Sequence, residues 1–166
     1  MTLEPSGSLH HLPDGASLAF QRALPFDLER VWDAVATSPG LSAWIGEFTG
    51  DPASGTVEFA MTAESPDAQP HPVEIVRCSP GHAWEVISAP QLGGIHLAVE
   101  LHAADGGTAL TFSQLKIGAD QVESMGPGWE YYLDRLALSL SGGDTSTIGW
   151  DPYPAQLGPY YAGLTV

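Results

Sequence analysis

The stretch GPGWEYYLDRLALSL at residues 126–140 limits the possible folds of this 166-residue chain more than any other segment. Its large apolar residues recur at helical spacing: Trp129, Tyr132, Leu133, Leu136 and Leu140. This pattern predicts an amphipathic helix with one buried face. Pro127 suits the first turn of such a helix, because proline lacks the N–H that would be unpaired there. Gly142 and Gly143 are expected to end the helix.

The chain before this helix has a different periodicity, with apolar residues at every second position. The segment GIHLAVELHAADGGTALTFSQLKI at residues 94–117 predicts a β-hairpin, with its turn at Ala104–Gly107. A strand is expected at residues 17–24, followed by a helix that Asp27 caps and by a second short helix that Ser38 caps. Strands followed by one long helix predict an α+β architecture in which the helix covers the sheet.

The chain is expected to form one domain at residues 17–142. Residues 1–16 lack periodicity and are interpreted as a loose N-terminal leader. Residues 143–166 are rich in proline and glycine, yet they carry four large rings, Trp150, Tyr153, Tyr160 and Tyr161. So many rings are unusual in a solvated tail, and we therefore expect this aromatic tail to pack back on the domain.

Composition argues against several classes of partner. The net charge is -15, with five Lys and Arg residues among twenty acids, which disfavours binding to nucleic acid or to an anionic membrane surface. No apolar run is long enough for a membrane span, and no signal-peptide pattern begins the sequence. The single cysteine, Cys78, excludes an internal disulfide and fits a reducing compartment, so a cytoplasmic location is expected.

Residues that could carry chemistry do not form a recognisable constellation. His96 and His102 share one face of a strand but lie about 20 Å apart along it, so they cannot bind one metal ion together. We expect no metal, no cofactor and no catalytic residue. Acid–base chemistry would have to use Tyr132 or one of the strand carboxylates Glu58, Glu74 and Glu85. Alternation places Glu58 and Glu74 outward and leaves the direction of Glu85 open.

Three segments resemble a known family: ERVWDAVATSPGLSAWIG (29–46), GGTALTFSQLKI (106–117) and GPGWEYYLDRLALSLSG (126–142). They are similar to the START-like, or Bet v 1-like, superfamily (SRPBCC), and within it to the group named for the C-terminal domain of the activator of Hsp90 ATPase. The resemblance covers residues 17–142. It implies a helix-grip fold, in which a curved antiparallel sheet wraps around a long C-terminal helix and two short helices follow the first strand.

The resemblance also implies a cavity between sheet and helix that binds an apolar or aromatic small molecule. The expected ligand-binding residues are Trp44, Phe48, Phe59, Met61, Trp84, Met125, Trp129 and Tyr132. The same rings could instead fill the core. Two other functions remain open. One is a protein-interaction module, either Hsp90-activator-like or a homodimer formed through Tyr131 and Leu138 on the outer side of the helix. The other is an enzyme similar to polyketide cyclases and aromatases, with cyclase- or dehydratase-like acid–base chemistry.

Overall fold

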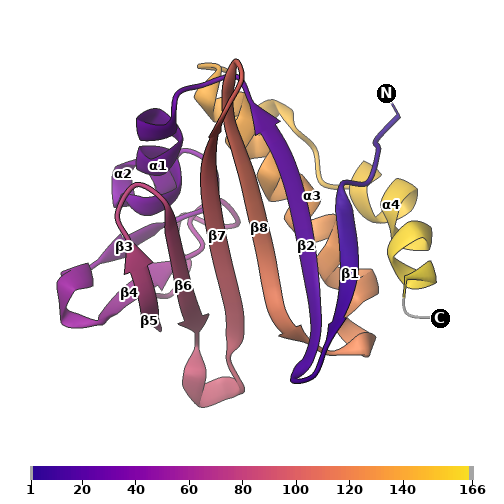
Figure 1. The fold of residues 1–166 in the computed structure, drawn as a ribbon, viewed down its shortest axis with the longest axis horizontal. Coiled ribbons are helices and arrows are strands. Elements are labelled where there is room, and N and C mark those ends of the chain that lie inside the picture. Colours follow the sequence, from indigo (N-terminus) through magenta and orange to yellow (C-terminus); the bar gives the residue numbers. More distant parts are fainter. Residues whose placement is uncertain (1, 165–166) are drawn as a thin grey trace.

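The fold is built from one sheet and the helices that cover it (Figure 1). The computed structural model describes residues 2–164. The strands are β1 Gly7–Leu12, β2 Gly15–Leu24, β3 Glu47–Thr49, β4 Thr56–Ala60, β5 His71–Ser79, β6 Ala83–Ser88, β7 Ile95–Ala104 and β8 Gly107–Ile117. The α-helices are α1 Leu28–Ala36, α2 Ser38–Ser42, α3 Val122–Leu140 and α4 Pro152–Gly163. Short 3-10 helices are η1 Pro52–Ser54, η2 Pro90–Leu92, η3 Ala119–Gln121 and η4 Thr145–Thr147.

The sheet is antiparallel throughout, with the strand order β1-β2-β8-β7-β6-β5-β4-β3. It is curved and does not close into a barrel. In Figure 1, α3 lies behind β8 and β2, and α4 lies beside α3 near β1. The predicted α+β helix-grip fold, with a curved antiparallel sheet around a long C-terminal helix and two short helices after the strand predicted at residues 17–24, is confirmed.

The core lies between the concave face of the central strands and α3. Phe20 of β2 pairs in register with Phe112 of β8, which in turn pairs with Val99 of β7. These three side chains are 0–4% exposed. The ring of Trp129 on α3 lies 4.8 Å from that of Phe112, measured between ring centroids. The helical face that the sequence predicts is therefore the face that covers the sheet.

Helix α3 differs from the prediction at its start and on its polar face. It begins at Val122, so Pro127 lies inside the helix and not in its first turn. The preceding 3-10 turn leads directly into the helix, which moves its beginning upstream. Helical periodicity places Glu130 and Arg135 on the polar side of α3, yet they are 1% and 8% exposed. Glu130 is covered by Ser6, Arg22 and Tyr161, whereas Arg135 donates to the carbonyls of Trp44 and Thr145.

Residues 7–12 and 152–163 form regular elements that pack on the rest of the fold. Residues 7–12, interpreted from sequence as part of a loose leader, form β1 and pair with β2 along their whole length. Residues 152–163 of the aromatic tail form α4. Three of its side chains, Tyr153, Leu157 and Tyr161, are 0–4% exposed and belong to the hydrophobic core.

The two short helices begin at side-chain caps. The Asp27 carboxylate accepts a hydrogen bond from the Arg30 N–H at 2.9 Å, which confirms the predicted cap of α1. The cap of α2 is Thr37, whose hydroxyl accepts from the Gly40 N–H at 3.1 Å, and not the predicted Ser38. Ser38 instead exchanges two hydrogen bonds with the backbone of Phe48 and so fixes α2 to β3.

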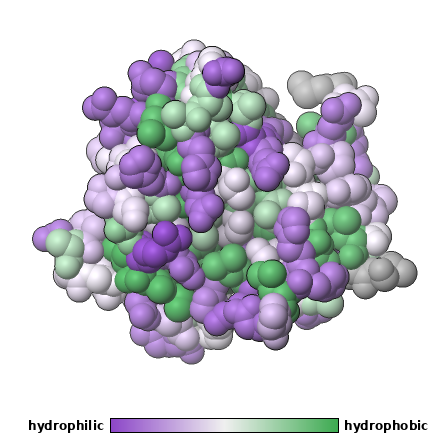
Figure 2. Space-filling model, viewed as in Figure 1, coloured by the Kyte–Doolittle hydropathy of each residue, from purple (hydrophilic) through white to green (hydrophobic). Residues whose placement is uncertain are grey.

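The surface of the described chain is mixed in character. Figure 2 shows the face seen in Figure 1, where hydrophobic areas are separated by hydrophilic residues. Among residues 2–164, no helix is both long and apolar enough to cross a membrane.

Candidate ligand-binding site

The residues predicted to bind a ligand differ in how deeply they are buried. Trp44, Trp129 and Tyr132 are 4–8% exposed and belong to the hydrophobic core. The half-buried residues are Phe48, Phe59, Met61, Trp84 and Met125. All of these except Phe48 pack against the same core. The structure thus gathers seven of the eight residues around one core, and their contact with a ligand stays a prediction.

Two tryptophans of this set connect the core to α1. The Trp44 indole N–H donates to the carbonyl of Ala34 at 2.9 Å. The Trp84 indole N–H donates to the carbonyl of Val35 at 3.0 Å. Both carbonyls lie in the last turn of α1, where helix carbonyls have no intrahelical partner. The two rings are therefore fixed by the helix end as well as by apolar packing.

The other two buried rings make polar contacts of a different kind. The Trp129 indole N–H donates to Oε1 of Gln114 at 2.8 Å. The Tyr132 hydroxyl donates to Oε1 of Glu64 at 2.8 Å. Burial and then this bond to Glu64 raise the pKa of Tyr132 above its ordinary value. Tyr132 is therefore a neutral hydrogen-bond donor at neutral pH, and it cannot act as a base there.

Gln114 is a site residue that sequence reasoning missed. Its side chain is 2% exposed and lies on β8 two positions after the buried Phe112. In the β8 pattern, Leu110 and Phe112 point into the core, and the same alternation brings Gln114 to the concave face. A polar residue at an inward position of a strand was the signal that could have identified it.

The segment 61–70 lies next to this site, between β4 and β5. Its Ala63 N–H donates to the carbonyl of Ile45 at 3.2 Å, and its Glu64 accepts the bond from Tyr132. Met61 and Ala63 pack against the core from this segment. Two hydrogen bonds and the packing of two side chains against the core thus hold this loop beside the buried rings.

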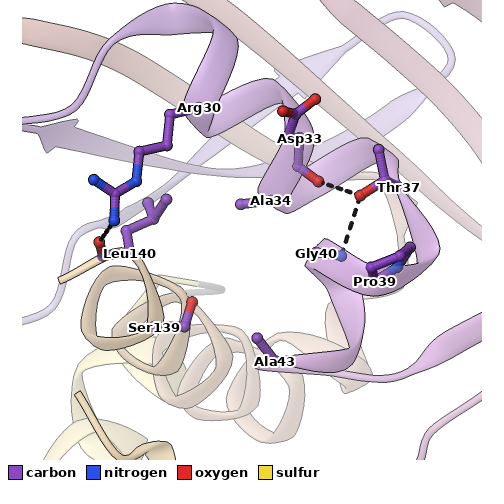
Figure 3. Close-up of a pocket in the computed structure, with 9 residues that line it drawn as sticks. All are labelled: Arg30, Asp33, Ala34, Thr37, Pro39, Gly40, Ala43, Ser139 and Leu140. Carbon is purple, nitrogen blue, oxygen red and sulfur yellow. Dashed lines mark hydrogen bonds between the residues drawn. The ribbon is translucent and has the colours of Figure 1, made fainter. Parts of the chain in front are cut away.

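A pocket of about 580 Å³ lies elsewhere, between α1, α2 and the end of α3 (Figure 3). It is lined by Arg30, Asp33, Ala34, Thr37, Pro39, Gly40, Ala43, Ser139 and Leu140. Two of its polar side chains bond to backbone carbonyls that also line it: Arg30 donates to the Leu140 carbonyl, and the Thr37 hydroxyl donates to the Asp33 carbonyl at 2.7 Å. None of the eight predicted residues lines it. The pocket is a gap between helix ends, in which the Arg30 guanidinium and the Thr37 hydroxyl already have partners.

A second pocket, of about 270 Å³, holds the carboxylate whose direction the sequence left open. It is lined by Leu12, Asp14, Gly15, Ala16, Ser17, Glu85, Leu115 and Lys116. Glu85 alternates with Trp84 along β6, so it lies on the opposite side of the sheet from the core. Glu58 and Glu74 are exposed. The acid–base candidates therefore do not converge on Tyr132, and no group of three or more potential metal ligands occurs within residues 2–164.

An ionic network lies on the side of α3 that faces β2, α4 and the N-terminal segment. Arg22 of β2 donates to Glu130 at 2.5 Å and to Asp134 at 2.7 Å. Glu130 also accepts from the backbone N–H of Ser6 at 2.6 Å and from the hydroxyl of Tyr161. Burial alone lowers the pKa of Arg22, but the bonds and charges of the two carboxylates outweigh burial and raise it. This network joins the N-terminal segment, β2, α3 and α4.

Comparisons with known proteins agree with this architecture. Residues 25–141 match the model of the family described as Activator of Hsp90 ATPase homolog 1-like protein. The crystal structure of CalU16 from Micromonospora echinospora is 20% identical, has a TM-score of 0.74, and the match covers 98% of this chain and 97% of that one. None of the curated proteins compared with the chain matches it.

Two further solved structures differ in how much of the chain they cover. Protein EF2215 from Enterococcus faecalis, described as of unknown function, is 13% identical with a TM-score of 0.70, and the match covers 95% of this chain and 91% of that one. Protein NE0264 from Nitrosomonas europaea is 18% identical with a TM-score of 0.63, and the match covers 76% of this chain and 94% of that one. At these identities the likeness is one of fold.

Proposed function

The chain belongs to the family of activator of Hsp90 ATPase homolog 1-like proteins, and on this premise we propose that it binds an apolar or aromatic small molecule between the concave face of its sheet and helix α3. This fold is of the kind that binds hydrophobic ligands. The proposed contact residues are Trp44, Phe48, Phe59, Met61, Trp84, Met125, Trp129 and Tyr132.

The observation that carries this proposal is the incomplete burial of large apolar side chains that face the core. Phe59, Met61, Trp84 and Met125 all pack against the core, yet each remains only half-buried. Apolar surface left in contact with water is unfavourable, and a ligand that covered it would gain free energy in proportion to the area buried. Ligand sites are mostly apolar and carry few polar groups, as this region does.

The other two functions have less support. The outer patch proposed for a homodimer is partly occupied, because the Tyr131 ring lies 5.5 Å from that of Trp150 and 5.3 Å from that of Tyr153, between centroids. A cyclase-like enzyme would need a base near the buried rings. Of the candidates that the sequence offered, Glu85 lies on the opposite side of the sheet and Tyr132 stays protonated. Glu64, the carboxylate beside the rings, already accepts the hydrogen bond of the Tyr132 hydroxyl. We therefore propose binding and assign no catalytic residue.

The methionines provide a direct test of the site. The chain has three, of which Met61 and Met125 are proposed contacts and Met1 begins the sequence. Selective 13C labelling of the methionine methyl groups gives three NMR signals, which Met61→Leu and Met125→Leu assign. We expect the Met61 and Met125 signals to shift saturably when an aromatic probe such as acetophenone is added.

A shift that rises linearly with probe concentration and does not saturate indicates a non-specific effect. Native mass spectrometry of the freshly purified protein, followed by solvent extraction, would identify any compound that co-purifies. If neither Met61 nor Met125 shifts up to the solubility limit of a series of aromatic probes, and the protein carries no bound compound, the proposed function is wrong.

A further inference from the structure

Resting on the proposed function, we propose that the Gln114 side chain is the polar contact of the ligand site, and that the ligand carries a neutral carbonyl oxygen which accepts a hydrogen bond from its Nε2. This inference rests on the buried amide group of Gln114. Its oxygen Oε1 accepts a hydrogen bond from Trp129, and its nitrogen Nε2 has no partner among residues 2–164.

The orientation of the Gln114 amide follows from chemistry. The indole N–H of Trp129 can only donate, so the atom that it contacts at 2.8 Å must be the amide oxygen Oε1. Nε2 and its two N–H groups therefore point away from Trp129. An exchange of the two amide atoms would bring two donors together, which is unfavourable.

Nε2 has no hydrogen-bond partner of its own within residues 2–164. Among residues 2–164 the single hydrogen bond of the Gln114 side chain is the one to Trp129. In the same part of the chain, no fully enclosed side-chain nitrogen or oxygen lacks a partner. Nε2 must therefore touch a space that a solvent-sized molecule can reach, although the residue as a whole is only 2% exposed.

The surroundings of Gln114 are apolar. Its neighbours in register are Leu18 of β2 and Leu97 of β7, and Leu97 is half-buried. An unpaired amide donor in such surroundings is costly, and leucine or methionine would fill the same position without that cost. A ligand oxygen, or a water molecule that the ligand displaces, satisfies the donor.

Charge selects the class of acceptor. A carboxylate would also accept from Nε2, but the chain carries a net charge of -15, and the Glu64 carboxylate already lies beside the site, where it accepts from Tyr132. The guanidinium of Arg135, the arginine near these rings, donates to the backbone carbonyls of Trp44 and Thr145. An anionic ligand would therefore enter against repulsion without a counter-ion. A neutral aromatic ketone or quinone would fit the site. It has apolar surface for the aromatic side chains and an uncharged oxygen that can accept a hydrogen bond from Nε2.

The test compares three probes of the same shape: acetophenone, α-methylstyrene and benzoate. The second replaces the carbonyl oxygen by a CH2 group, and the third adds a negative charge. We expect acetophenone to bind about threefold to tenfold more tightly than α-methylstyrene, as one net hydrogen bond implies, and benzoate to bind least. In Gln114→Glu, which keeps an oxygen for Trp129 and removes the N–H groups, this preference should disappear.

The matched control is Gln21→Glu on the neighbouring strand β2, where the side chain is exposed. A second readout needs no variant. The chain has six glutamines and no asparagine, so the 15N spectrum contains only six side-chain NH2 pairs, and the other five glutamines are exposed. The Gln114 pair should shift with acetophenone and much less with α-methylstyrene.

The outcomes separate the two proposals. If the Met61 and Met125 signals move while the Gln114 pair does not, and acetophenone and α-methylstyrene bind equally well, the inference about Gln114 is wrong and the proposed function stands. Tighter binding of benzoate would overturn the assignment of a neutral acceptor. If no probe moves any of these signals, the proposed function fails and the inference fails with it.

Discussion

Glu130 is a carboxylate held inside the protein by donors from three other segments of the chain. Ser6 donates to it twice, and Arg22 and Tyr161 donate once each. Such a charge would be very unfavourable if it were buried alone, and the Arg22 guanidinium compensates it. Arg22 also bonds to Asp134, so one cation serves two carboxylates. The stability of the domain should depend strongly on this single arginine.

Replacing Arg22 by methionine is expected to destabilise the protein by about 3 kcal/mol, because it leaves Glu130 buried without a counter-ion. The free energy of unfolding from urea titration measures this loss. The control is Arg77→Met, which removes an exposed ion pair with Glu100 whose atoms are 3.9 Å apart. That change should cost less than about 1 kcal/mol. Equal losses in the two variants would contradict the role of the buried network.

Tyrosine ionisation should limit stability at high pH. Burial and then a bond to a carboxylate raise the pKa of Tyr132, Tyr153 and Tyr161 above the ordinary value of about 10. Below pH about 10 these tyrosines are neutral in both the folded and the unfolded protein, and their contribution to the free energy of unfolding is fully present. At higher pH the unfolded chain loses their protons first, so stability falls by about 1.4 kcal/mol per pH unit for each tyrosine.

Tyr161→Phe tests this dependence through the slope of stability against pH and not through stability itself. Between pH 10 and 11.5 the slope should become less steep by about 1.4 kcal/mol per pH unit, because one titrating group is gone. Leu157→Ala, which removes no titrating group, serves as the control and should keep the original slope. An unchanged slope in Tyr161→Phe would show that Tyr161 does not contribute.

The inward or outward direction of polar residues was the least predictable part of the sequence. Glu130 and Gln114 are both buried, and both were missed for the same reason. Helical and strand periodicities assign polar residues to the solvent face by default. Whether a partner such as Arg22 or Trp129 meets them depends on contacts between segments that lie far apart in the chain.

At the scale of elements, α4 shows how tertiary packing can select a helix against composition. The segment has prolines at positions 152, 154 and 159, and composition alone favours a loop. Tyr153, Leu157 and Tyr161 nevertheless recur at every fourth position and are all buried. Gly126 of α3 allows the closest contact, since a side chain there would collide with the Tyr161 ring.

The strands and α3 were predictable because their periodicities run over many residues, as in the hairpin of β7 and β8. The spacing of Tyr153, Leu157 and Tyr161 was also present in the sequence. It was hidden by the prolines, two of which lie in the first turn of α4, where a missing N–H costs nothing. The third, Pro159, removes one hydrogen bond inside the helix, and burial of the neighbouring side chains offsets that loss.

Leu157→Ala measures what the packing of α4 contributes. The side chain is 1% exposed, so its truncation leaves a cavity between α4 and the rest of the core. We expect a loss of about 2–5 kcal/mol in the free energy of unfolding. Leu12→Ala, at a side chain that is 50% exposed, should change it by less than about 0.5 kcal/mol. If both variants were equally stable, α4 would not be part of the cooperative core.

At the scale of the whole molecule, the chain consists of a family core with additions at both ends. The family match spans residues 25–141, whereas β1, β2 and α4 lie outside it. The buried network connects these parts, since Arg22 and Tyr161 lie outside the match and Glu130 and Asp134 lie inside it. The match with CalU16 covers 98% of the chain, and that with NE0264 covers 76% of it.

The net charge of the molecule predicts how its thermal stability depends on salt concentration. Of twenty acidic residues, only Glu130, Asp134 and Glu100 form ion pairs among residues 2–164, and the net charge is -15. Most carboxylates therefore repel one another in the folded state, which opposes compactness. Raising NaCl from 10 mM to 500 mM shortens the screening length from about 30 Å to less than about 8 Å and should weaken this repulsion.

We expect the Tm to rise by about 3 °C or more over that range, equivalent to about 1 kcal/mol for a domain of this size. Potassium chloride should give the same rise, which separates screening from binding of a particular cation. The loss caused by Arg22→Met should stay nearly constant with salt, because buried pairs are screened much less than exposed charges. A Tm that falls with salt would mean that attractive surface pairs outweigh the repulsion, contrary to the charge pattern of this chain.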